Sequence, residues 1–371
     1  MKIPLMDISC EKSILNEIQE KIYSIILRND FINGKEIELF ENNFAKFVNN
    51  NYCVSCSNGT DALILALKTL NITNNDKVIV PVNTFIATAE AVTAVGAKIV
   101  FVDSQPDSLE INYQQIADIL ENDTKKEIKA IIPVHLYGHM NNIFLIQEIA
   151  KKFNIKVIED SSQAHGAKYK NISPGELSDI ATYSFYPGKN LGAFGDAGAL
   201  TTNNYDYYIK AKMLRNHGRY NKKYEHEIEG YNMRLDTIQA AILDVKLKYL
   251  SQYNQMRKQK AALYNSLLEN TGDLILPIFD NDIYQDVWYI YTIRTKFRDK
   301  LQNYLLENNI QTGIYYPIPL HLQKAYRYLN YDKGKFPKAE KIANEILALP
   351  LWPFIQDDTI YYICQKIKEF Y

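Results

Sequence analysis

The sequence lacks several features that mark secreted, membrane or nucleic-acid-binding proteins. Four cysteines in 371 residues are too few for a disulfide framework. The N-terminal stretch has no apolar core of signal-peptide length, and no run approaches the roughly 18 apolar residues that a membrane span needs. Lysine and arginine number 42 against 43 aspartates and glutamates, so no basic excess can neutralise a phosphate backbone or an anionic membrane. We therefore expect a cytoplasmic protein with neither nucleic acid nor membrane as a partner.

Metal and redox motifs are also missing. Cys53 and Cys56 form a CxxC pair, but they lie in an alternating segment that predicts a strand, and no second pair follows. We interpret both as structural cysteines. His135 and His139 are four residues apart in a segment containing proline and glycine, which predicts a loop and not a metal-binding helix face. No metal site is predicted.

The composition is that of an ordinary folded protein, with 47% hydrophobic and 23% charged residues, and this excludes wholesale disorder. A chain of this length is expected to form one large domain and one smaller domain. We place the large domain, with an N-terminal segment, at residues 1–245 and the small C-terminal domain at residues 246–371.

Short apolar runs alternate with amphipathic helical stretches from about residue 50 to residue 202. This alternation is typical of right-handed crossovers and of a mostly parallel sheet covered by helices on both faces. After residue 235 a long helical run over 236–270, a strand over 287–294 and a helix over 297–309 predict a smaller α+β domain. The fold class is therefore α/β, and the seven expected strands are 52–56, 77–81, 98–103, 130–136, 156–160, 181–185 and 197–202.

Two segments that follow strands carry groups suited to chemistry, because ligands of such sheets bind beyond the carboxyl ends of the strands. The segment SNGT (57–60) begins a helix, and its amides can bind an anion, although plain helix capping is the commoner role of such residues. Glu159 and Asp160 end a strand that we expect to be buried. A carboxylate there needs a cationic partner, which is either a protonated heteroaromatic nitrogen or a lysine or arginine from elsewhere in the chain.

Lys189 lies in a glycine-rich loop between two apolar strands. A lysine that is partly removed from water loses its proton easily and becomes a nucleophile toward carbonyls. An anion site, a carboxylate for a ring nitrogen and a nucleophilic lysine are together what pyridoxal 5′-phosphate (PLP) requires. The order and spacing of the three segments therefore favour a PLP site.

The chain resembles the DegT/DnrJ/StrS family of nucleotide-sugar aminotransferases, which are fold-type I PLP enzymes. The similarity spans nearly the whole length. It begins at FINGKEIELFENNFAKF (31–47) and continues through SNGTDAL, PVNTFIATAEAV, PVHLYG, EDSSQAHGA, SFYPGKNLGAFGDAGA, LRNHGR, GYNMRLDTIQAA and YYPIPLH.

This resemblance implies roles for individual residues. Lys189 matches the Schiff-base lysine, Asp160 the partner of the pyridine nitrogen and Gln163 the residue beside the phenolic oxygen. Phe85 matches the aromatic that stacks on the ring. Gly59, Thr60 and Ser184 match phosphate ligands, and Asn232 matches one donated by the neighbouring subunit, which implies a homodimer with shared active sites. Substrate contacts are expected from Tyr186, Tyr316 and His321, with Arg219 and Tyr220 reaching the nucleotide from across the interface.

The stretch around Lys189 is similar to that of family members that aminate C-3 of a keto-sugar. We therefore expect transfer of an amino group from L-glutamate to C-3 of a dTDP-3-keto-6-deoxyhexose, giving a 3-amino-3,6-dideoxyhexose donor for surface polysaccharide or glycosylated metabolites. Some relatives carry histidine in place of the lysine and catalyse dehydration, but this chain keeps Lys189. Two alternatives stay open: another nucleotide sugar, aminated at C-4 or on a UDP or GDP carrier, and a non-catalytic PLP-binding regulatory sensor.

Overall fold

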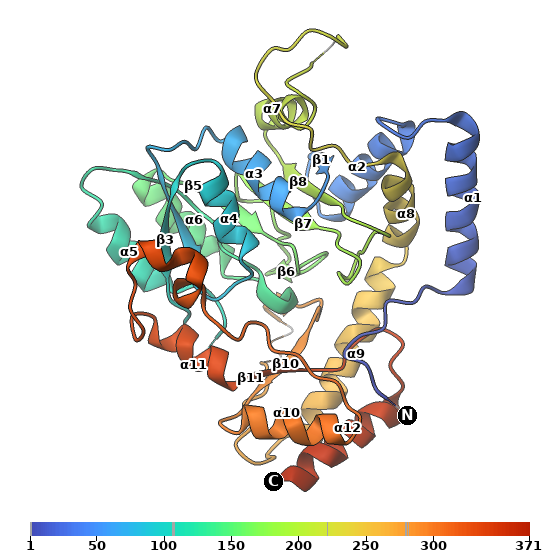
Figure 1. Ribbon diagram of the computed structural model, residues 1–371, viewed down its shortest axis with the longest axis vertical. Helices are drawn as coiled ribbons and strands as arrows, with labels where there is room; N and C mark the ends of the chain where they lie inside the picture. The colour runs from blue at the N-terminus through green and yellow to red at the C-terminus, as the bar shows by residue number, and fades with distance from the viewer. Residues whose placement is uncertain (1, 106–107, 221, 279, 281) are drawn as a thin grey trace.

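Residues 52–202 contain a seven-stranded sheet in the order β1-β8-β7-β5-β4-β2-β3 (Figure 1). The computed structural model describes residues 2–105, 108–220, 222–278, 280 and 282–371. The prediction of an α/β fold with a mostly parallel seven-stranded sheet is confirmed. The strands are β1 (Tyr52–Cys56), β2 (Lys77–Pro81), β3 (Lys98–Val102), β4 (Ile128–Ile131), β5 (Lys156–Asp160), β7 (Ile180–Ser184) and β8 (Gly198–Thr202).

One strand of this sheet runs against its neighbours. The pairs joining β3, β2, β4, β5 and β7 are parallel, whereas β8 is antiparallel to both β7 and β1. Strand β4 ends at Ile131, five residues before the end of the expected strand 130–136. The chain beyond it passes through an isolated bridge between Val134 and Asp160 into the short helix η1 (Leu136–Gly138).

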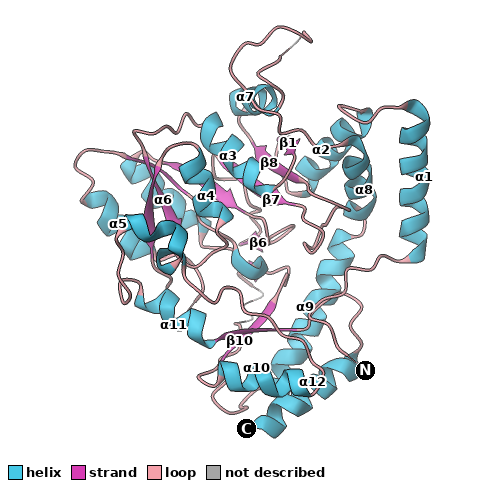
Figure 2. Cartoon of the chain, in the orientation of Figure 1, coloured by secondary structure: helices cyan, strands magenta, loops and turns pink. Residues whose placement is uncertain are grey.

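Helices cover both faces of the sheet (Figure 2). Successive side chains of a strand point to opposite faces, so the apolar side chains on each face need a covering layer. Val78 and Val80 pack with α3, α4 and α7 on one face, whereas Ile79 packs with α5 and α6 on the other. At the β1 end, α2 and α8 cover the second face, and α1 packs on the outer side of α8. These helices are α1 (Lys12–Arg28), α2 (Lys35–Phe47), α3 (Gly59–Thr69), α4 (Ala87–Ala94), α5 (Tyr113–Glu121), α6 (Ile143–Phe153), α7 (Tyr205–Arg215) and α8 (Thr237–Leu247).

The C-terminal part of the chain forms a second apolar core around a two-stranded antiparallel sheet. The expected helix over 236–270 is two helices that break at residues 248–249, and the expected strand over 287–294 is shorter. Ile3 pairs with Ile310, so the first residues of the chain contact this C-terminal part. Its elements are α9 (Leu250–Leu268), β10 (Tyr291–Arg294), α10 (Arg298–Glu307), η2 (Leu320–Leu322), η3 (Lys324–Leu329), α11 (Pro337–Glu345), β11 (Ile346–Leu349) and α12 (Asp357–Phe370).

A small ribbon joins the two parts, since β6 (Lys168–Tyr169) pairs with β9 (Tyr284–Gln285). A mixed apolar cluster adds to the contact, with Leu136 and Tyr137 packing on Ile290 and Ile346. Among the residues that the structure describes, no helix combines the length and apolar character that crossing a membrane demands.

Candidate active site

The N-terminus of α3 forms one wall of the candidate site. Asn58 caps the helix by accepting a hydrogen bond from the backbone N–H of Asp61 at 2.8 Å. The amides of Gly59 and Thr60 in the same turn have no partner inside the helix. A Cβ atom at position 59 would lie 2.5 Å from Cβ of Ser184 at the end of β7, so only glycine lets the two segments meet. Both the capping role and the conditions for an anion site are therefore present.

Asp160 and Glu159 end β5 and point to opposite faces of the sheet. Asp160 Oδ2 accepts a hydrogen bond from the Thr88 hydroxyl on α4 at 2.8 Å. Glu159 is fully buried, and its carboxylate contacts His135 Nε2 at 2.7 Å, the amide of Gly175 at 2.7 Å and the Ser178 hydroxyl at 2.5 Å. Glu159 thus has its partners already, and Asp160 is the carboxylate that lies on the α3 and α4 face.

Lys189 lies in the loop between β7 and β8, with its side chain partly buried. Burial lowers the pKa of Lys189 to about 8, and the negative charge of Asp160 offsets this only in part. Its Nζ is 4.6 Å from the ring centre of Tyr289, which comes from the C-terminal part. Gly192 allows the loop to fold tightly, because a Cβ atom there would lie 2.3 Å from the carbonyl oxygen of Pro187. The loop therefore presents an amine that gives up its proton near neutral pH.

Gln163 contacts both the chain after β4 and the C-terminal part of the chain. Its Oε1 accepts a hydrogen bond from the Tyr137 amide at 2.6 Å, and its Nε2 is 3.4 Å from the Tyr316 hydroxyl. The ring of Tyr316 in turn lies 5.8 Å from that of Phe85, whose side chain is about half exposed. Phe85, Gln163 and Tyr316 are thus brought together, with the exposed ring of Phe85 free to stack on a ligand.

These groups fit PLP. Orphan amides at Gly59 and Thr60 beside Ser184 suit a phosphate group, and Lys189 is an amine with a lowered pKa. Asp160 interacts electrostatically with both Lys189 and Tyr316, which places the carboxylate on the same side of the sheet as the amine and the aromatic residues. The arrangement can therefore hold a phosphorylated heteroaromatic ring by its phosphate, its face and its nitrogen.

The five expected substrate residues have different surroundings. Tyr186 is exposed at the Lys189 loop, where its carbonyl accepts the amide of Lys189 at 2.8 Å. His321 is only 2% exposed, and its Nε2 is 3.0 Å from Glu340, with its ring edge-on to Phe336. Tyr316 lies beside Gln163, with its hydroxyl 3.4 Å from Gln163 Nε2.

Arg219, Tyr220 and Asn232 belong to the segment that follows α7, and the carbonyl of Met233, next to Asn232, accepts the amide of Ser57 at 3.2 Å, just before the N-terminus of α3. Arg219 forms a backbone bridge with His226, and Asn232 is an exposed residue that bridges to Asn216. Tyr220 interacts with Tyr205 at the start of α7. The roles of these three residues toward a second subunit stay predictions.

Three residues of the site are not predicted from the sequence. Thr88 lies within the motif NTFIATAEAV, but its bond to Asp160 crosses from α4 to β5. Tyr289 belongs to a segment that predicts a strand and nothing more. His165 is fully buried 2.9 Å from the carbonyl oxygen of Ser184, and burial together with the charge of Lys189 lowers the pKa of its imidazole to about 3. Each of these contacts joins segments far apart in the sequence, so no local pattern reports them.

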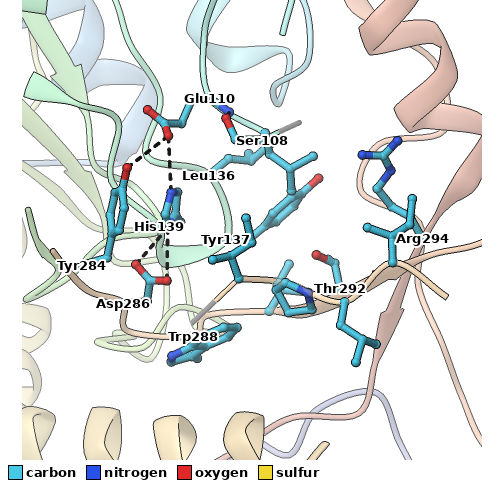
Figure 3. Close-up of a pocket in the computed structure, with 16 residues that line it drawn as sticks. Ser108, Glu110, Leu136, Tyr137, His139, Tyr284, Asp286, Trp288, Thr292 and Arg294 are labelled. Atoms are coloured by element: carbon cyan, nitrogen blue, oxygen red, sulfur yellow. Dashed lines mark hydrogen bonds and ion pairs between the residues drawn. The ribbon is translucent and has the colours of Figure 1, made fainter. Parts of the chain in front are cut away.

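A separate cavity of about 170 Å³ lies between the two parts of the chain (Figure 3). Its walls are mainly apolar, with Leu136, Tyr137 and Trp288 among them. At its polar end His139 Nδ1 is 3.0 Å from Asp286, and its Nε2 is 3.7 Å from Glu110. Burial alone would lower the pKa of His139, but the bonds to Asp286 and Glu110 outweigh it and raise the pKa to about 10. The cavity does not include Lys189 or Asp160.

The CxxC pair lies in strand β1, as its alternating pattern predicts. Cys53 and Cys56 are buried free thiols on β1, and burial raises the pKa of each. In residues 2–105, 108–220, 222–278, 280 and 282–371, no group of three histidine, cysteine, aspartate or glutamate side chains could hold a metal ion.

Comparison with known proteins gives one consistent family. The model of the DegT/DnrJ/EryC1/StrS aminotransferase family matches residues 12–368. A Geobacillus stearothermophilus protein named pleiotropic regulatory protein is 41% identical, with 100% of this chain and 99% of the relative covered. The dTDP-3-amino-3,6-dideoxy-alpha-D-galactopyranose transaminase of Aneurinibacillus thermoaerophilus is 40% identical over 99% of each chain.

Solved structures agree with these sequence matches. The crystal structure of DesV from S. venezuelae, in complex with a ketimine intermediate, matches with a TM-score of 0.95 at 36% identity and covers 99% of this chain and 98% of that one. Other solved structures with this fold hold the cofactor in its pyridoxal or pyridoxamine phosphate form.

Proposed function

Because the chain belongs to the DegT/DnrJ/EryC1/StrS aminotransferase family and is a PLP-dependent nucleotide-sugar aminotransferase, we propose that it transfers an amino group from L-glutamate to C-3 of a dTDP-3-keto-6-deoxyhexose. The observation that carries the reaction is Lys189, an amine with a pKa of about 8 that interacts with Asp160. The position on the sugar and the dTDP carrier are supported by the name of the Aneurinibacillus relative. The product would be dTDP-3-amino-3,6-dideoxyhexose.

The residues of this chain have distinct tasks in that proposal. PLP, when bound, supplies a carbonyl that takes up the amino group and a ring that accepts electrons. Lys189 Nζ removes and returns the proton at the carbon that carries nitrogen, which its lowered pKa favours near neutral pH. Asp160 would keep a proton on the ring nitrogen, and Phe85 would stack on the ring. Gly59, Thr60 and Ser184 would hold the phosphate.

Product analysis tests the substrate. The enzyme is incubated with L-glutamate and a panel of dTDP-, UDP- and GDP-linked keto-sugars, and the products are identified by mass spectrometry and NMR. We expect turnover of the dTDP-linked 3-keto-6-deoxy sugar with nitrogen on C-3. Nitrogen on C-4, or exclusive use of a UDP-linked sugar, would contradict the proposal.

A regulatory role is the second candidate, and the 41% identical relative named as a regulatory protein favours it. The two functions differ in what L-glutamate does to the bound cofactor. An aminotransferase converts it to the amine form, and its visible absorption is lost. A sensor that only binds PLP keeps that absorption. We expect complete loss, restored by adding the keto-sugar.

We further propose that the active unit is a homodimer with shared sites. Exposed apolar side chains gather along α1 and the turn that follows it, where Ile26, Leu27, Phe31 and Ile32 would be covered by a second copy. Asn232 is exposed and available to such a partner. If each site combines Lys189 of one subunit with Asn232 of the other, mixed dimers of two inactive variants regain one intact site.

Mixing Lys189→Ala with Asn232→Asp subunits tests this directly. Statistical exchange should restore about a quarter of wild-type activity, because half of the dimers are mixed and each has one good site of two. Each variant mixed with itself is the control. A fully active monomer in sedimentation, or no recovery after verified exchange, would reject shared sites.

A further inference from the structure

A chain of buried hydroxyl groups leads to Asp160. The Thr88 hydroxyl donates to Asp160 Oδ2 at 2.8 Å, and the hydroxyl oxygens of Thr84 and Thr88 are 3.2 Å apart. The other carboxylate oxygen accepts the amide of Ser162 at 3.2 Å. Thr84, Thr88 and Asp160 are 3%, 1% and 4% exposed, so water does not compete for these bonds. Both carboxylate oxygens are therefore held, each from a different direction.

The direction of the chain follows from counting hydrogens. An ionised carboxylate only accepts hydrogen bonds, so Thr88 must donate to Asp160. A hydroxyl has one hydrogen, and that of Thr88 is then used. The bond between the two threonines must therefore have Thr84 as donor and Thr88 as acceptor. A hydroxyl that accepts one bond becomes a better donor in the next, so Thr84 strengthens the hold of Thr88 on Asp160.

We propose that Thr88 is a positioning residue that fixes the Asp160 carboxylate for the cofactor's ring nitrogen, with Thr84 supporting it; this rests on the role proposed above for Asp160. Rotation of the carboxylate would break the bonds from Thr88 and Ser162 together, so its free lone pairs keep one orientation. Thr84 and Thr88 also flank Phe85 at the start of α4. One short segment thus carries the aromatic residue proposed to stack on the cofactor ring and also positions the carboxylate proposed to bind the ring nitrogen.

A merely structural threonine would behave differently, and the chain offers a matched control. Thr69 at the end of α3 is 1% exposed, and its hydroxyl has no hydrogen-bond partner in the described part of the chain. Replacing either threonine with valine keeps the shape and removes the hydroxyl. If only the loss of a buried hydroxyl matters, Thr88→Val and Thr69→Val have the same consequences. If Thr88 positions Asp160, only Thr88→Val alters the cofactor.

The experiment measures the holoenzyme in three ways: the pH titration of the bound cofactor's visible absorption, the cofactor dissociation constant, and the rate of conversion by L-glutamate. For Thr88→Val we expect the midpoint of the absorption titration to shift by about one pH unit and the rate to fall about tenfold, as for one lost hydrogen bond to a charged group. Thr88→Ser should bring the midpoint to within about half a pH unit of the wild type and the rate to within about threefold. Thr84→Val should have a smaller effect in the same direction as Thr88→Val. Thr69→Val should match the wild type.

Asp160→Asn separates failure of this inference from failure of the proposed function. In the Asp160→Asn background, adding Thr88→Val should change the titration no further, because Thr88 acts through the carboxylate. If Asp160→Asn leaves the titration unchanged, the role of Asp160 is wrong and the inference falls with it. If Asp160→Asn shifts the titration but Thr88→Val does not, only the inference is overturned. Should Thr88→Val not fold, Thr84→Val and Thr88→Ser carry the same comparison.

Discussion

Lys189 and His139 are two partly buried bases whose pKa values the protein shifts in opposite directions. Burial lowers the pKa of Lys189 to about 8, because Asp160 offsets only part of the cost of burying its charge. His139 is buried too, but Asp286 and Glu110 both bond to it, and together they raise its pKa to about 10. The number of carboxylates in contact decides the outcome. A buried base with too little negative charge nearby loses its proton easily and can react. A base bonded to two carboxylates stays protonated and joins two parts of the chain.

The largest effect is expected at Lys189. Lys189→Ala should abolish turnover and leave the fold intact, because the side chain supplies the reacting amine and is only partly buried. Lys210→Ala is the matched control, since burial also lowers the pKa of Lys210 but its Nζ bonds to Thr69 and Asn71 at the C-terminal end of α3, away from the site. Steady-state rates and circular dichroism measure both. Multiple-turnover activity near that of the wild type in Lys189→Ala would show the assignment to be wrong.

The next effect separates the two neighbouring carboxylates of β5. Asp160→Asn should lower the rate on the order of a hundredfold, because an amide cannot balance a pyridinium, while the unfolding midpoint stays near that of the wild type. Glu159→Gln should lower the unfolding midpoint and leave the rate near that of the wild type. It disrupts the buried contact with His135 but does not change the face of the sheet that carries Asp160. Rates per folded molecule and thermal unfolding distinguish them. If Glu159→Gln lowers the rate more than Asp160→Asn does, Glu159 and not Asp160 is the partner of the ring nitrogen.

A third prediction concerns the pH at which Lys189 becomes reactive. Only the neutral amine attacks a carbonyl, so capture of PLP by the cofactor-free protein should rise about tenfold per pH unit and level off above about pH 8. Stopped-flow absorption across pH 6 to 10 measures this. N-acetyl-lysine is the reference amine, and its rate should keep rising to higher pH. A protein profile that parallels the reference would contradict the lowered pKa.

The smallest effect on activity is expected at His139, where the change should appear in stability. The folded pKa of about 10 lies above the ordinary value of 6.5, so the stabilisation is complete below pH 6.5 and is lost as the pH rises toward 10. Asp286→Asn should lower the free energy of unfolding by about 1–2 kcal/mol at pH 6, with the difference shrinking toward pH 10. Denaturant unfolding at both pH values measures it.

The control for that prediction is an exposed pair. Lys152 and Glu121 are 2.9 Å apart, with both side chains more than half exposed. Glu121→Gln should therefore change stability by no more than a few tenths of a kcal/mol. If Asp286→Asn lowers the free energy of unfolding by an equally small amount, or if its effect grows with pH, the raised pKa of His139 is contradicted.

Much of the fold follows from local pattern. Residues 52–56, 77–81 and 156–160 alternate as strands, and each appears with those bounds as β1, β2 and β5. The family resemblance, the fold class and PLP as the cofactor are likewise confirmed. Segment 287–294 shows where pattern fails. It alternates throughout, yet only Tyr291–Arg294 pairs as β10, because residues 287–290 instead bond to the turn at Tyr137 and Gly138.

The sequence by itself determined which residue types could serve the site: a lysine in a glycine-rich loop, carboxylates at a strand end and small residues at a helix start. Local pattern alone could not decide between Glu159 and Asp160, because neighbouring residues of a strand face opposite sides. The family resemblance favoured Asp160, and the packing of α4 on β5 gives the physical reason, since it places Asp160 on the side that carries the site. The sequence also could not predict Tyr289 beside Lys189 or Thr88 beside Asp160. Those contacts join segments distant in the chain, and burial in the folded protein is what gives Lys189 its lowered pKa.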